Sequence, residues 1–91
     1  MYKTISVRVT GKVQGVFFRQ STKEKARELG ITGLVKNEAD GSVYIVATGT
    51  GAQLDELVTW CRQGPPRAKV ESVKTNELVP QVFESFTIQH G

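Results

Sequence analysis

The chain has 91 residues, of which 38% are hydrophobic and 23% are charged. This composition is typical of a folded globular protein and excludes a disordered chain, which combines low hydrophobicity with high net charge. The length suits one modest core, so we expect residues 1–91 to form a single domain. No apolar run approaches the ~20 residues that a membrane-spanning helix needs, and we expect no membrane association.

The net charge of +3 comes from 12 Lys and Arg against 9 Asp and Glu, and the basic residues are scattered. This pattern favours a small anionic ligand over a nucleic acid. Cys61 is the single cysteine, which excludes an intramolecular disulfide and a multi-cysteine metal site. Together with an N-terminal segment that has no signal-peptide pattern, it predicts a reducing, cytoplasmic location.

The first half of the chain contains a clear strand followed by a helix. Ile5, Val7 and Val9 alternate with polar residues, which predicts a strand over residues 3–10. A loop follows, and residues 18–29 then place their apolar side chains on one helical face. Gly30 is suited to end this helix in a left-handed conformation.

The rest of the chain predicts four further strands and a second helix. Strands are expected at 32–38 and 42–48, joined by a hairpin turn at Asp40-Gly41. Thr50 and Gln53 form a capping-box pattern that opens a helix ending near Gln63. Residues 68–75 and 83–89 each alternate apolar and polar side chains, the first with an irregularity, and predict two final strands.

This order of elements, βαββαβ with an extra strand at the end, predicts a ferredoxin-like α+β sandwich. We expect an antiparallel sheet of four to five strands with both helices packed on one face. The fold serves many functions, so the function has to be inferred from a site.

Two residues that often carry catalysis are poorly placed for it. His90, the only histidine, is next to the end of the sequence and is expected to be frayed and exposed. Cys61 lies on the apolar face of the second helix and is expected to be a buried, inert thiol. The sequence also lacks a Walker A motif and a cluster of metal-ligating residues. Chemistry that needs a protein nucleophile, a metal ion or another cofactor is therefore not expected.

The loop between the first strand and the first helix is a candidate anion site. It leads into a helix N-terminus, where unpaired backbone N–H groups and the helix dipole favour anions. Gly15 would allow close approach, and Arg19 in the first turn offers a planar fork to a phosphate. Spacing alone leaves the alternative open that Arg19 is a surface residue and Gly15 a turn residue. It likewise leaves open whether Asn37 belongs to a site or caps local backbone.

Residues 11–19, GKVQGVFFR, resemble the acylphosphatase signature G-x-V-Q-G-V-x-F-R. Residues 33–43, GLVKNEADGSV, are similar to the second signature of that family, G-x-V-x-N-x-x-D-G-x-V. Residues 64–70, GPPRAKV, resemble the segment that follows its second helix. The likeness covers nearly the whole chain.

The resemblance implies an enzyme that hydrolyses acyl phosphates to a carboxylate and inorganic phosphate by in-line attack of water, without a metal ion or other cofactor. It implies that Arg19 binds the phosphate and that Asn37 orients the attacking water. The rest of the phosphate cradle would come from the backbone N–H groups of Gln14, Gly15, Val16, Phe17 and Phe18. The position of Phe17 varies in the family, and glycine is common there in microbial members. A monomer is expected at this size.

Two alternatives come from other functional classes. RNA-binding modules share the fold and stack bases on aromatic side chains of the central strands, where this sequence offers only Tyr44. A non-catalytic anion-binding domain would keep the loop and lose the reaction. The enzyme reading also predicts that Arg19 and Asn37 lie near one edge of the sheet.

Overall fold

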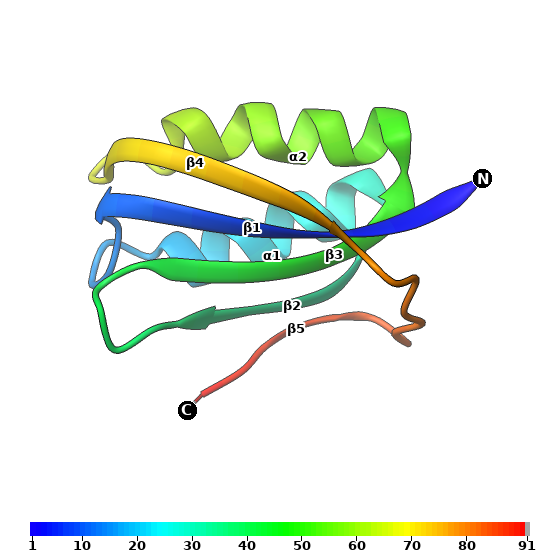
Figure 1. The fold of residues 1–91 in the computed structure, drawn as a ribbon. Helices are drawn as coiled ribbons and strands as arrows, with labels where there is room; N and C mark the ends of the chain where they lie inside the picture. Colours follow the sequence, from blue (N-terminus) through cyan, green and yellow to red (C-terminus); the bar gives the residue numbers. More distant parts are fainter. Residues whose placement is uncertain (91) are drawn as a thin grey trace.

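A computed structural model describes residues 1–90. Its elements follow the expected order (Figure 1): β1 (Tyr2–Lys12), α1 (Phe18–Leu29), β2 (Thr32–Asn37), β3 (Val43–Thr50), α2 (Gly51–Gln63), β4 (Lys69–Leu78) and β5 (Phe86–Ile88). The ferredoxin-like fold is thus confirmed. The predicted bounds were wrong for the last two strands: β4 runs three residues further, because it pairs with β1 as far as Thr4, and β5 is only three residues long.

The five strands have the order β4-β1-β3-β2-β5. The first four form antiparallel pairs, as predicted, but β5 runs parallel to β2 and makes the sheet mixed. The reason is the path of the chain after β4. Leu78 pairs with Thr4, so β4 ends where β1 begins, and the chain turns there and crosses to the far edge. It enters β5 from the end at which β2 starts, and so runs in the same direction.

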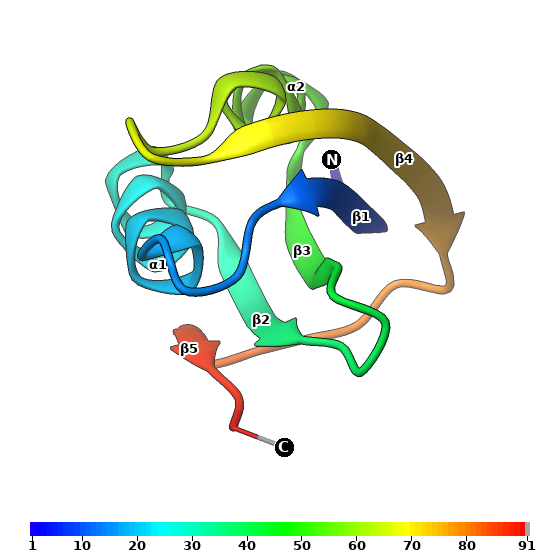
Figure 2. The same cartoon turned by 90° about the vertical axis from the view of Figure 1, so that its left-hand side faces the viewer.

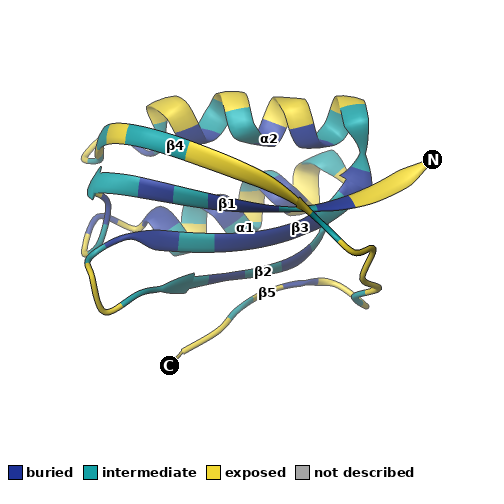
Figure 3. Ribbon diagram, in the orientation of Figure 1, coloured by how far each residue is buried: buried dark blue, intermediate teal, exposed yellow. Residues whose placement is uncertain are grey.

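Both helices cover one face of the sheet (Figure 2). The core lies between these two layers, where Val7, Ile45, Phe18 and Leu57 are almost fully buried. Figure 3 shows the buried residues concentrated on β1, on β3 and on the inner faces of the helices. None of the helices among residues 1–90 is long and apolar enough to cross a membrane.

Local hydrogen bonds explain where α2 begins and how β2 turns into β3. Thr50 accepts from the Gln53 backbone N–H, and the Gln53 side chain accepts from the Thr50 N–H, which completes the predicted capping box. In the predicted hairpin turn, Asp40 accepts hydrogen bonds from the backbone and the hydroxyl of Ser42. These bonds hold the pKa of the Asp40 carboxyl below its usual value.

The strand directions bring three chain segments to one end of the sheet. Both β1 and β2 are antiparallel to β3, so their carboxyl ends lie at the same end, and β5, parallel to β2, adds a third. The loop after β1 begins there with a bulge at Gly11, whose φ is 123°. A side chain at Gly11 would collide with the Lys69 carbonyl oxygen. This end of the sheet carries the cavity that follows.

Candidate active site

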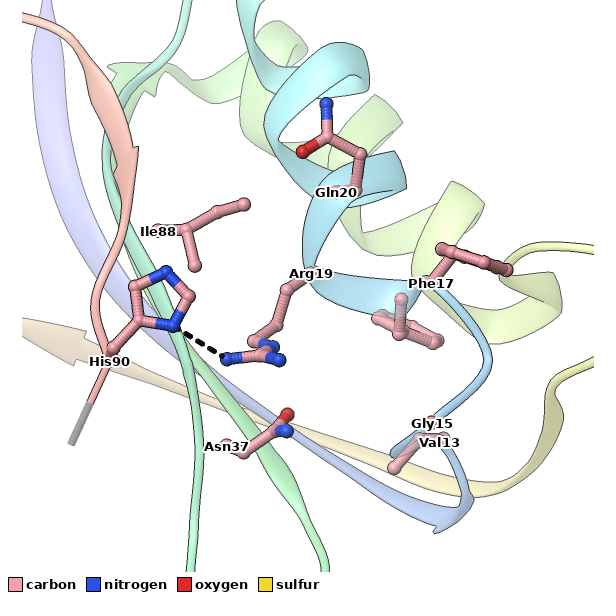
Figure 4. A pocket seen from close by; sticks show the side chains of 9 residues that line it. Val13, Gly15, Phe17, Arg19, Gln20, Asn37, Ile88 and His90 are labelled. Atoms are coloured by element: carbon pink, nitrogen blue, oxygen red, sulfur yellow. Dashed lines mark hydrogen bonds between the residues drawn. The ribbon is translucent and has the colours of Figure 1, made fainter.

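A cavity of about 360 Å³ lies at the carboxyl ends of β1, β2 and β5 (Figure 4). It is lined by Val13, Gly15, Phe17, Phe18, Arg19, Gln20, Asn37, Ile88 and His90. Five of the seven site residues predicted from the sequence are among them. The other two, Gln14 and Val16, lie in the same loop but do not line the cavity.

Gln14 and Val16 hold the loop in place. The Gln14 side-chain N–H₂ donates to two carbonyls of the β2–β3 turn, those of Glu38 at 2.8 Å and Ser42 at 2.9 Å. Val16 is buried in the core cluster. The loop is therefore tied to the hairpin that carries Asn37 on one side and to the hydrophobic core on the other.

The loop backbone contains two left-handed residues. Gly15 and Phe17 both adopt left-handed conformations, with φ of 73° and 64°. Turns that mix left-handed and right-handed residues direct successive N–H groups toward one concave side. Glycine adopts this conformation freely, but for Phe17 it costs roughly 1–2 kcal/mol. Strain of this kind concentrates at functional sites, where the surrounding structure holds it.

The loop leads into an N-terminus of α1 that its own side chains leave open. The Phe17 side chain makes no capping hydrogen bond, and the first turn has no acidic residue. The first backbone bond of the helix runs from the Ser21 N–H to the Phe17 carbonyl. The N–H groups of residues 18–20 therefore have no helical acceptor, and the helix dipole makes their surroundings electropositive.

Arg19 and Asn37 face each other across the cavity. Arg19 extends from the first turn of α1 toward Asn37, which is the last residue of β2 (Figure 4). Among residues 1–90, Asn37 Oδ1 is the one buried side-chain nitrogen or oxygen atom without a hydrogen-bond partner. A buried acceptor left unpaired costs about 1–3 kcal/mol, so such an atom calls for a functional explanation. Arg19 and Asn37 thus line one cavity, which lies at the end of the sheet.

His90 is part of the same cavity, which the sequence reasoning missed. It is exposed, as expected, but its Nδ1 lies 3.4 Å from Nη1 of Arg19. The prediction of a frayed end was wrong because β5 pairs with β2 and carries the following residues to the site. One signal was present: the alternation of Phe86 and Ile88 continues to His90. The alternation did not reveal which strand β5 would pair with.

The remaining reactive side chain is far less accessible. Cys61 is fully buried on α2, as predicted, and burial raises the pKa of its thiol to about 12. The thiol therefore stays protonated and shielded near neutral pH. In the part of the chain that the structure describes, His, Cys, Asp and Glu residues form no group of three that could hold a metal ion.

Comparison with known proteins relates this geometry to a family. The model of the acylphosphatase family matches residues 5–88. The chain belongs to the acylphosphatase family. It is 53% identical over 83 residues to an acylphosphatase of Marinobacter nauticus, covering 90% of each chain. It is 49% identical over 87 residues to one of Shewanella amazonensis, covering 94% of this chain and 96% of the relative.

Solved structures agree. An acylphosphatase from Coxiella burnetii superposes with a TM-score of 0.94 at 43% identity, covering 97% of this chain and 93% of its own. One from Bacillus subtilis gives a TM-score of 0.93 at 32% identity, covering 98% and 99%. The chain is thus an acylphosphatase, a hydrolase whose substrate is an acyl phosphate and whose product is phosphate. The structure does not favour the RNA-binding alternative. The Arg8 guanidinium carbon lies 4.9 Å from the centroid of the Tyr44 ring, so Arg8 already covers the one aromatic ring that could stack on a base.

Proposed function

We propose that this acylphosphatase binds the phosphate group of its substrate with Arg19 and the backbone N–H groups of residues 14–18, and that Asn37 holds the attacking water. The observation that carries the proposal is the buried, unpaired Asn37 Oδ1 beside the Arg19 side chain. An amide oxygen accepts a hydrogen bond from water, and the amide N–H₂ can donate a second bond. Asn37 can therefore orient a water molecule, but it is too weak a base to deprotonate one.

The positive charge needed for phosphate binding comes from two sources. Arg19 supplies a permanent cation with several N–H donors in one plane, which match the oxygens of a phosphate. The uncapped N-terminus of α1 supplies backbone N–H groups and the positive end of the helix dipole. A guanidinium at a helix N-terminus opposes the dipole, and a bound dianion between the two removes that conflict.

The reaction needs little further help from the protein. The water oxygen forms a bond to phosphorus while the bond from phosphorus to the acyl oxygen breaks, and the electron pair leaves with the carboxylate. A carboxylate is a good leaving group, so no strong general acid is required. The proton of the water passes to a phosphate oxygen. Positioning and electrostatic stabilisation of the phosphoryl oxygens then provide most of the catalysis.

We further propose that residues 1–91 form a single domain that acts as a monomer in the cytoplasm, with neither metal ion nor nucleic acid. The family match spans 84 of the 91 residues, and Arg19 with the helix N-terminus supplies the charge that a metal would otherwise provide. Light scattering should give the monomer mass, 10.0 kDa. Hydrolysis of benzoyl phosphate should be unchanged by a chelator, and loss of activity on chelation would contradict metal independence.

The decisive experiment separates water positioning from phosphate binding. Asn37→Ala should lower kcat for benzoyl phosphate about 100-fold and leave competitive inhibition by phosphate within a factor of two. Asn76→Ala, on an exposed position of β4, is the matched control and should change neither value. Equal losses in kcat and in phosphate affinity for Asn37→Ala would show that Asn37 binds phosphate and does not hold the water.

A further inference from the structure

His90 reaches the phosphate site from a segment that neither family signature contains. The Gln89 N–H donates to the Val35 carbonyl at 2.9 Å, which extends the contact between β5 and β2 by one residue. The pairs Gly33–Phe86 and Val35–Ile88 keep a constant offset. Asn37 and His90 follow the second of these pairs by two residues each, and both line the cavity. The imidazole then turns to the Arg19 guanidinium (Figure 4).

The contact with Arg19 limits the role that His90 can take in it. A guanidinium has only donors, so a hydrogen bond between these two nitrogens requires Nδ1 of His90 to be the acceptor. With Nδ1 as the acceptor, the ring hydrogen of a neutral imidazole would lie on Nε2. Among residues 1–90, Arg19 and His90 are the only ones with ionisable side chains that line the cavity. The other polar side chains there are amides, Gln20 on α1 and Asn37 on β2.

A bound dianion changes the charges that surround the His90 imidazole. An anion held by the Arg19 guanidinium lies within a few ångströms of the imidazole, because Nη1 and Nδ1 are 3.4 Å apart. Protonated His90 would face a cation in the free enzyme, whereas in the complex it faces two negative charges. We propose that His90 is a second phosphate-binding residue, which accepts from Arg19 when neutral and donates to the bound phosphate when protonated. This rests on the proposed function, since it requires the anion at Arg19.

The proposal predicts a reciprocal link between protonation and anion binding. Sulfate is the suitable probe, because it stays a dianion between pH 5.5 and 8 whereas phosphate titrates. One added cation near a dianion should tighten sulfate binding about five- to tenfold as the pH falls from 8 to 5.5. The same coupling should move the titration midpoint of the imidazole up by about 0.7–1 pH unit when sulfate saturates the site.

Two substitutions isolate the charge of His90. His90→Gln keeps an acceptor for Arg19 but cannot take up a proton, so its sulfate affinity should stay near the pH 8 value at every pH. His90→Lys carries the charge throughout, so its affinity should stay near the pH 5.5 value of the natural enzyme. The measurement is the competitive inhibition constant of sulfate against benzoyl phosphate at constant ionic strength.

A second measurement does not depend on activity. His90 is the only histidine, so its imidazole proton signals in an NMR titration need no assignment. Sulfate should move the midpoint in the natural protein and leave it unmoved in Arg19→Ala. Sulfate affinity in His90→Gln that follows pH as in the natural enzyme would overturn the role of His90. Undiminished sulfate affinity in Arg19→Ala would instead overturn the proposed phosphate site itself.

Discussion

The two helices of this acylphosphatase begin in opposite ways. At α2, Thr50 and Gln53 satisfy each other's backbone N–H groups, so the helix end is closed by its own side chains. At α1, Phe17 offers no capping bond, adopts a left-handed conformation, and precedes an arginine that the dipole disfavours. Both helices pack on the same core, so the difference does not arise from the fold. It indicates that α2 is built for stability and that α1 leaves its N–H groups for an anion.

The largest effect is expected when Arg19 is removed from the uncapped N-terminus of α1. Arg19→Ala should lower kcat/KM for benzoyl phosphate about 1000-fold, since it removes the cation that faces the phosphoryl oxygens. The free energy of unfolding should change by less than about 1 kcal/mol, because the guanidinium opposes the helix dipole. Arg62→Ala, in the last turn of α2, is the control and should keep full activity. A large loss of stability in Arg19→Ala would contradict the contrast.

The next test adds phosphate, which should bind at the uncapped N-terminus of α1. Phosphate at ten times its dissociation constant should stabilise the protein by about 1.4 kcal/mol, which raises Tm by roughly 5–10 °C for a chain of this size. Thermal unfolding followed by circular dichroism, with and without phosphate, measures the shift. Arg19→Ala should show less than a quarter of it at the same phosphate concentration. An equal shift in both proteins would place the stabilising anion elsewhere.

Removing the N-cap of α2 should have a smaller effect, and only on the stability of the protein. Thr50→Ala removes the acceptor for the Gln53 N–H and should cost about 1 kcal/mol in urea unfolding. Its kcat/KM for benzoyl phosphate should stay within a factor of two. Thr59→Ala, exposed in the middle of α2, is the matched control and should leave both values nearly unchanged. Loss of activity in Thr50→Ala would show that α2 also serves the site.

The smallest effect is expected at Phe17. Phe17→Gly relieves a left-handed conformation at a residue that is 73% exposed, but it adds chain entropy to the unfolded state. The two effects oppose each other, and the free energy of unfolding should change by no more than about 0.5 kcal/mol. The KM for benzoyl phosphate should rise about threefold while that for acetyl phosphate stays constant, since only the benzoyl ring can pack on Phe17. Equal changes for both substrates would exclude this contact.

Local sequence patterns predicted most of this structure. Alternation and helical periodicity located both helices and the first three strands, and the signals at Thr50, Asp40 and Gly30 coincide with the observed caps and turn. These features depend on residues within a few positions of one another. Arg19 and Asn37 were found through the two signatures, each of which contributes one of these residues to the cavity.

Long-range pairing accounts for what the sequence did not predict. The direction of β5 depends on where the chain crosses after Leu78, which no local pattern encodes. The contact of His90 with Arg19 joins residues 71 positions apart and follows from that crossing. The binding of Gln14 to the β2–β3 turn depends likewise on how the loop meets the hairpin.

We expect the short edge strand β5, which carries part of the cavity wall, to open more easily than the rest of the site. It has three residues, pairs with a single neighbour and is anchored in the core by Phe86, whereas β1 and β3 are paired on both sides. Segments of this kind open by local unfolding at a lower free energy than the whole molecule. Opening of β5 would withdraw Ile88 and His90 while the loop, Arg19 and Asn37 keep their places. The amide of Gln89 should therefore exchange with solvent faster than the amides of β1, and phosphate should slow it.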